Sequence, residues 1–114
     1  MPDARSDLLQ GTLEMLVLTT LTLEPMHGWG ISVRLRQISG EVFDVQQGSL
    51  YPALQRMLRR GWVRAEWRAS EHNRRARYYE ITREGERQLE AQRADWALSS
   101  RAVDRVLRTA FQGG

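Results

Sequence analysis

Arginine is concentrated in the middle of this sequence. Residues 56–83 hold nine Arg and three acidic residues, a balance of 9 − 3 = +6, whereas the rest of the chain holds eight Arg and eleven acids, 8 − 11 = −3. The net charge of +3 is therefore the sum of a basic segment and a mildly acidic remainder. Guanidinium groups bind phosphates and the acceptor atoms of guanine, so this segregation indicates nucleic-acid binding. The absence of Lys fits a GC-rich genome as well as selection for Arg.

Four polar side chains just before the basic segment can form hydrogen bonds with DNA: Gln46, Gln47, Ser49 and Tyr51. They stand at the start of an expected helix, the end that commonly enters the major groove. A Gln amide can pair with N6 and N7 of adenine, and Ser or Tyr hydroxyls suit phosphates. Polar residues at a helix start can also be solvated caps, but the arginines that follow favour DNA contact.

Four arginines complete the predicted DNA contacts: Arg56 on the same helix, and Arg74, Arg75 and Arg77 in a later hairpin. We expect the hairpin arginines to approach the backbone or the minor groove and to position the protein on phosphates. Arg59 and Arg60 also lie off the apolar face of the helix. Each of them either reaches a phosphate or is solvated or paired with an acid.

The elements that would position these residues begin with three helices, at about residues 6–24, 29–38 and 47–60. Each helix is predicted from apolar residues at helical spacing. In the second helix, Ile31, Leu35 and Ile38 give the face that should meet the core. Pro25 and Gly40 follow the first two helices and favour their ends there.

Two strands are predicted at residues 62–69 and 77–82, because apolar and polar side chains alternate there with a period of two. Val63, Ala65 and Trp67 would share the apolar face of the first strand. A polar loop joins the strands and would form an exposed tip. A helix followed by a basic hairpin predicts a mostly α (α+β) fold, a winged helix-turn-helix with a two-stranded wing and a long C-terminal helix.

Thr82 is a good N-cap for the last helix, which should reach about residue 110. Apolar residues recur in it every seven positions, which favours packing against another helix. The predicted dimer interface comprises Leu9 and Leu13 of the first helix with Leu89, Trp96, Val103 and Leu107 of the last. The division expected is a DNA-binding domain at 1–82 and a dimerisation helix at 83–114. The alternative is a last helix that packs back on its own small domain.

Trp96 is the candidate ligand-binding residue. A dimer would bring two copies of the middle of the last helix close together, and two indole rings could then sandwich a flat aromatic molecule. The alternative is that Trp96 fills the seam between the helices as part of the core.

Other chemistry is not expected. The chain has no Cys, and His27 and His72 are isolated, so we expect neither a metal site nor another cofactor. No nucleophile motif and no glycine-rich phosphate loop suggests an enzyme. The most apolar run, residues 8–23, is short and is interrupted by Gln10 and Glu14, so no membrane span or signal peptide is expected. A cytoplasmic protein is the simplest prediction.

Four segments of the chain resemble the PadR family of bacterial transcriptional regulators: LLQGTLEMLVLTTL, HGWGISVRLRQISG, QQGSLYPALQRMLRRGWV and RARYYEITREGERQL. They cover about residues 7–90 in the family's order, and the single helix after the wing is similar to the smaller branch. The resemblance implies a homodimeric winged-helix repressor, with the first and last helices at the interface and a small effector in some members. Tyr51 matches the family's tyrosine on the DNA-reading helix. Ser49 stands where the family usually has Thr, and Trp29 where it usually has Tyr at a position expected to be structural.

Two other classes of function stay open. A winged-helix dimer could serve as a protein-interaction or ligand-binding module without DNA binding. An RNA binder that reads shape would be recognised by competition with duplex RNA. The basic segment together with Tyr51 and the polar helix start favours double-stranded DNA as the partner.

Overall fold

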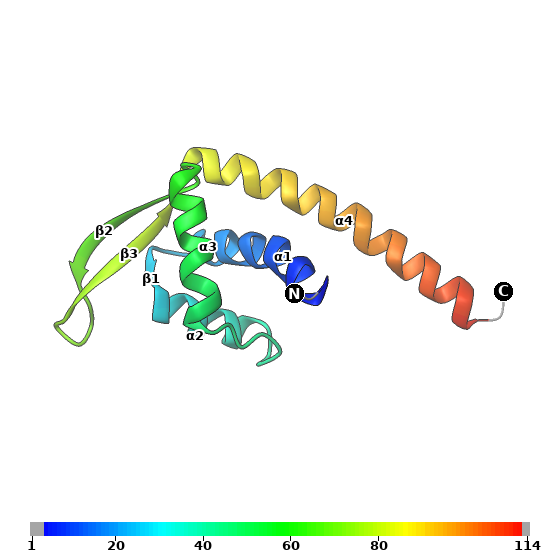
Figure 1. Cartoon of the computed structure of the whole chain (residues 1–114), viewed down its shortest axis with the longest axis horizontal. Helices are drawn as coiled ribbons and strands as arrows, with labels where there is room; N and C mark the ends of the chain where they lie inside the picture. The colour runs from blue at the N-terminus through cyan, green and yellow to red at the C-terminus, as the bar shows by residue number, and fades with distance from the viewer. Residues whose placement is uncertain (1–3, 113–114) are drawn as a thin grey trace.

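The structure, a computed structural model, describes the backbone of residues 4–112 and the side chains of residues 11–112. Its elements are α1 (Ala4–Leu21), β1 (Met26–His27), α2 (Gly28–Ile38), α3 (Gln47–Arg59), β2 (Val63–Ala69), β3 (Arg75–Ile81) and α4 (Arg83–Phe111). Helices α1, α2 and α3 form a body, from which the β2–β3 hairpin extends on one side and α4 on the other (Figure 1). The predicted mostly α winged helix-turn-helix with a long C-terminal helix is confirmed. Within the described residues, no helix is both long and apolar enough to cross a membrane.

The sheet has three antiparallel strands in the order β1-β3-β2, one more than predicted. The extra strand, β1, pairs Met26 with Tyr79 and His27 with Tyr78. Two residues are too few to show the alternation of apolar and polar side chains that marks a strand in a sequence. This strand is therefore recognised only by its pairing with β3. This pairing places the start of α2 beside the base of the hairpin.

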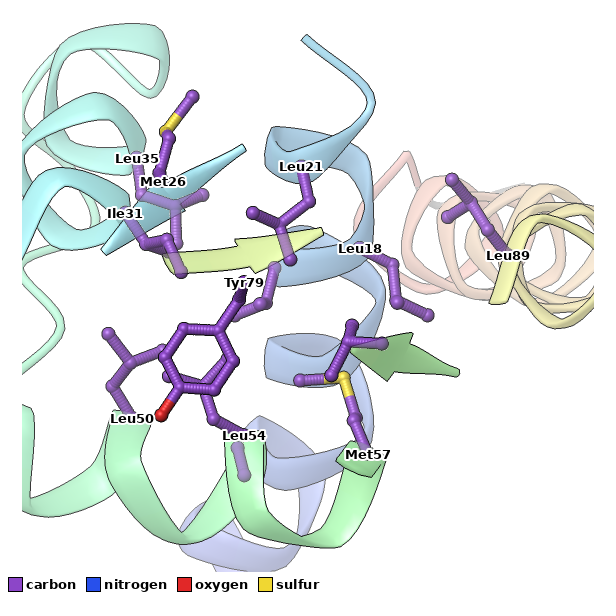
Figure 2. Close-up of a cluster of buried hydrophobic side chains, with 13 residues drawn as sticks. Leu18, Leu21, Met26, Ile31, Leu35, Leu50, Leu54, Met57, Tyr79 and Leu89 are labelled. Atoms are coloured by element: carbon purple, nitrogen blue, oxygen red, sulfur yellow. The ribbon is translucent and has the colours of Figure 1, made fainter. Parts of the chain in front are cut away.

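The core lies where the three helices of the body meet the base of the hairpin. Residues at i, i+3, i+4 and i+7 of α3 are buried, as expected for a helix with one apolar face. Side chains from α1, α2 and α3 converge around Tyr79 of β3, and Leu89 approaches from α4 (Figure 2). The buried apolar residues are Val17, Leu18, Leu21, Met26, Ile31, Leu35, Leu50, Ala53, Leu54, Met57, Val63, Tyr79 and Leu89.

Two of the residues expected in the core are exposed instead. Ile38 lies in the last turn of α2, beyond the contact with the body, and is exposed. Trp67 continues the apolar face of β2, but its side chain is 60% exposed. The hairpin has left the body at that point, so an apolar face that begins in the core ends in solvent. The first helix ends at Leu21, earlier than expected, in a turn in which Leu23 N donates to Thr20 O at 3.1 Å.

The start of α4 is fixed by the predicted cap. Thr82 Oγ1 accepts a hydrogen bond from Gly85 N at 3.0 Å and donates one to Gly61 O at 2.6 Å. Gly85 itself packs closely on the chain before β2, because a Cβ atom at this position would lie 2.1 Å from Trp62 O. These contacts connect the end of the hairpin to the start of the long helix.

Candidate nucleic-acid interface

A groove of about 510 Å³ separates the start of α3 from the hairpin. Its helical side includes Gln47 and Tyr51, and its hairpin side carries three arginines. The structure therefore brings five of the eight predicted DNA contacts into one groove: Gln47, Tyr51, Arg74, Arg75 and Arg77. Gln46 lines a neighbouring depression, and Ser49 is exposed on α3.

Three aromatic side chains of this groove are largely exposed. Tyr51 lies on α3 beside the buried face, on the side of the hairpin, and Trp67 projects from the hairpin. Trp29, expected to be structural, is 67% exposed at the start of α2 and also lines the groove. Large exposed aromatic groups are common at binding surfaces, where they supply contact area at small entropic cost. Sequence reasoning missed both tryptophans: Trp67 stands on the apolar face of a strand, and Trp29 stands at a position that the family resemblance suggested was structural.

Gln47 connects the two helices of the helix-turn-helix. Its Nε2 donates to Ser32 Oγ at 2.8 Å and to Gly28 O at 3.3 Å. Gln46, the N-cap residue, makes no side-chain capping bond. The amide of Gln47 thus holds α2 and α3 together, and the polar side chains nearest to it remain exposed for contact with a partner.

The two faces of the hairpin differ in charge. On the outer face, Arg64 forms an ion pair with Glu80, and Arg68 forms one with Glu66. On the groove face, Trp67 is paired across the strands with Arg77, and Ala69 is paired with Arg75. Within the described part of the chain, no carboxylate forms an ion pair with any of the three groove arginines, Arg74, Arg75 and Arg77. Positive charge is therefore neutralised on the outer face and left available on the groove face.

Two groove arginines lie over aromatic rings. The guanidinium carbon of Arg75 is 5.6 Å from the ring centroid of Trp67, and that of Arg77 is 5.9 Å from the ring of Tyr79. Burial raises the pKa of the Tyr79 hydroxyl, although the charge of Arg77 acts in the opposite direction. The phenol therefore stays neutral at physiological pH, and the positive charge of Arg77 is not cancelled.

His27 holds the tip of the hairpin to the start of α2. Its Nδ1 accepts a hydrogen bond from Gly30 N at 3.0 Å, so the neutral ring carries its proton on Nε2. That nitrogen lies 3.6 Å from Glu71 Oε1 in the hairpin loop. A hydrogen bond from its own backbone amide lowers the pKa of Glu71, and His27 and His72 act in the same direction when they are protonated. Among the described residues, no group of His, Cys, Asp and Glu could hold a metal ion.

Arg56 points away from the groove and binds α1. Its Nε lies 3.1 Å from Glu14 Oε1, and Arg60 Nη1 lies 3.3 Å from Glu14 Oε2. The Glu14 side chain is only 10% exposed, so it depends on these two partners for its hydrogen bonds. Arg59 is exposed and forms no ion pair within the described residues, which makes it the stronger candidate of the three for a phosphate contact.

The predicted dimer residues fall into two groups. Leu89 is buried in the core of its own chain, and Leu13 packs against that core, so both have apolar partners without a second chain. Trp96, Val103 and Leu107 are about half exposed on α4. The side chain of Leu9 lies outside the residues whose side chains are described. The distal half of α4 therefore does not pack back on its own domain.

The sequence profile of the PadR-like family of transcriptional regulators matches residues 17–91. The chain belongs to this family. A PadR-like transcriptional regulator from Bacillus cereus is 31% identical, with a TM-score of 0.76 and coverage of 90% of this chain and 98% of that one. A transcriptional regulator from Clostridium thermocellum is 25% identical, with a TM-score of 0.79 and coverage of 88% and 97%. An uncharacterized protein of Lysinibacillus sphaericus is 24% identical over 100 residues, 88% of this chain and 92% of that protein.

The PadR-like segment runs from the end of α1 into α4 and contains both sides of the groove. Members of this family regulate transcription and are not enzymes, so the prediction of a non-enzymatic regulator is confirmed.

The ion pair between Glu14 and Arg56 predicts different roles for Arg56 and Arg59 of α3. Glu14→Gln and Arg56→Ala should each lower the free energy of unfolding by about 1–3 kcal/mol, because a partly buried charged hydrogen bond is lost. Arg59→Ala should change that free energy by less than about 0.5 kcal/mol and should instead weaken DNA binding. Urea unfolding followed by circular dichroism measures the first effect. Equal stability of the Arg56→Ala and Arg59→Ala variants would contradict the assignment.

Proposed function

We propose that this PadR-like protein is a repressor that binds a pseudo-palindromic DNA operator as a homodimer. The observation that carries the proposal is the groove between α3 and the hairpin. It combines the exposed start of a helix with three arginines that have no carboxylate partner in the described chain. Phosphates are the natural partners of such arginines, and a helix start with exposed N–H groups attracts the same anions.

In the proposed complex, α3 enters the major groove with its N-terminal half. Gln46 and Ser49 are exposed at this end, and Tyr51 faces the space between helix and hairpin. Gln47 is engaged with α2, so we assign it the role of holding the helix angle rather than of reading a base. Arg59 takes the place of Arg56 as the phosphate contact from the far end of α3.

The proposed dimer uses α4, whose 29 residues extend roughly 44 Å at 1.5 Å per residue. Large apolar side chains are exposed on one side of its distal half: Trp96, Val103, Val106, Leu107 and Phe111. A second copy of the chain would remove these side chains from water, and each buried CH₂ group contributes about 0.8 kcal/mol. A twofold dimer presents two α3 helices, which is why the operator is proposed to be pseudo-palindromic.

Two further features belong to the proposal. Because a transcriptional regulator acts on the chromosome, we propose that the protein is cytoplasmic. Trp96 of each chain is the proposed site for a small aromatic effector, which would affect DNA binding only if its affinity differs between two states of the dimer. The competing function is a winged-helix dimer that binds ligands or proteins without binding DNA.

DNA binding is tested by anisotropy titration with a labelled duplex taken from upstream of the protein's own coding region, beside a scrambled duplex. We expect the protein to bind the upstream duplex selectively. Tyr51→Ala should lower this affinity, because α3 loses a contact with the DNA. If the dimer makes ~6–10 phosphate contacts, the affinity should fall roughly 10³- to 10⁵-fold between 50 and 200 mM salt. Binding to duplex RNA with equal affinity, or no binding at low salt, would reject the proposal.

Dimerisation is tested by placing a charge in the seam of α4. Val103→Lys should shift sedimentation equilibrium toward the monomer, because an ammonium group buried between helices loses its hydration. Ala94→Lys adds the same charge at an exposed position on the opposite side of α4 and should leave the dimer intact. A dimer of unchanged affinity in the Val103→Lys variant would place the interface elsewhere.

The effector site is tested with flat aromatic dyes of both charges, followed by dye fluorescence. We expect a dye that binds the dimer to lose its binding in Trp96→Ala and to keep most of it in Trp96→Phe, since stacking needs an aromatic ring. Unchanged dye affinity in Trp96→Ala would remove the proposed site and would leave Trp96 as part of the helix seam.

A further inference from the structure

We propose that Arg75, held over the ring of Trp67, is a specificity-determining residue that reads the width of the DNA minor groove. The preferred operator would then carry A·T pairs next to the bases that α3 contacts. This inference rests on the proposed DNA-binding function and concerns the same groove. In this inference the hairpin contributes to the choice of DNA sequence. The positive charge of its arginines would by itself only attract phosphates, whatever the sequence.

The register of the hairpin places Arg75 where it can leave the protein surface. One face of the hairpin starts in the core with Val63 and Tyr79 and continues outward to Trp67 and Arg75. Because the base of this face is buried, the direction of its outer end is fixed relative to α3. A helix in the major groove and a hairpin beside it lie on opposite sides of one phosphate backbone, so the hairpin faces the adjacent minor groove.

Arg75 differs from the other two groove arginines. Arg77 lies nearer to the body, over the buried ring of Tyr79, and is only partly exposed. Arg74 lies in the loop, where its carbonyl oxygen accepts a hydrogen bond from Ser70 N at 2.7 Å. Arg75 is exposed at the first position of β3, and its supporting ring, Trp67, is exposed as well. The Arg75 side chain can therefore extend away from the protein surface, and the Trp67 ring limits its motion.

The stacked guanidinium has the physical properties that minor-groove reading requires. A minor groove about 6 Å wide admits a flat group, and it is narrower and more negative in A-tracts. Guanidinium is planar and weakly hydrated, so it loses less hydration on entering than an ammonium group would. The Trp67 ring attracts the cation and holds its side chain in place before DNA arrives, which reduces the entropy lost on binding.

The chain provides a matched control on the other face of the same hairpin. Arg68 also lies over an aromatic ring, 5.3 Å from the centroid of Tyr78, but it is paired with Glu66 and faces away from the groove. A substitution to Lys preserves the positive charge at either position. Arg75→Lys and Arg68→Lys therefore differ in the face of the hairpin that they change and not in net charge.

The experiment uses the full chain and two duplexes with the same central operator, flanked on both sides by A·T tracts or by G·C tracts. We expect the wild-type chain to bind the A·T-flanked duplex roughly two- to fivefold more tightly. Arg75→Lys should abolish this preference and leave the salt dependence nearly unchanged. Arg68→Lys should keep the preference.

The role of Trp67 as a positioning residue is tested in the same assay. Trp67→Phe should retain part of the flank preference, because a ring remains under the guanidinium, and Trp67→Leu should lose it. Circular dichroism spectra and unfolding temperatures equal to those of the wild type show that a variant is folded. Selective operator binding with equal affinity for both flanks, or a preference that persists in Arg75→Lys, would overturn the inference alone. Absence of selective binding by the wild-type chain would overturn the proposed function and this inference with it.

Discussion

Burial of the base of the hairpin in the helical core fixes the position of the hairpin arginines relative to α3. Val63 and Tyr79 are each only 3% exposed, and they share the core with buried residues of α1, α2 and α3. Because interiors are closely packed, a hairpin anchored in this way cannot change its angle to α3 without opening the core. The groove between α3 and the hairpin is a consequence of this anchoring, as are the short β1 pairing and the contact between His27 and Glu71.

The distribution of ion pairs gives the protein one face for an anionic partner. Carboxylates form ion pairs with the arginines of the outer hairpin face, with Arg56 of α3 and with Arg60 directly after that helix. In the described part of the chain, none forms an ion pair with a groove arginine. An exposed ion pair contributes little to stability, about 0–1 kcal/mol, so the stronger effect of this arrangement is on the surface potential. By pairing with some arginines and not with others, the acidic residues determine which arginines can bind phosphates.

Helix α4 has a different role at each of its ends. Its first turn is fixed by Thr82 and by the close approach of Gly85 to Trp62, and Leu89 completes the core. Beyond Gln92 its side chains are mostly exposed, including several that are apolar. An isolated amphipathic helix of this kind gains most of its stability from packing against a partner. Regulation by the proposed effector would act through this half of the helix.

The sequence by itself determined the helices, the two long strands, the Thr82 cap and the concentration of arginine, because local periodicity, caps and composition depend on neighbours in the chain. Its motifs also identified the family. Only the tertiary structure decided that Arg56 binds Glu14, 42 residues away, and that Trp67 lies in solvent. Alternation shows which face of a strand is apolar, but it does not show where that strand leaves the core. Likewise, the number of arginines in a segment does not reveal which of them meet a carboxylate, since that depends on contacts between distant elements.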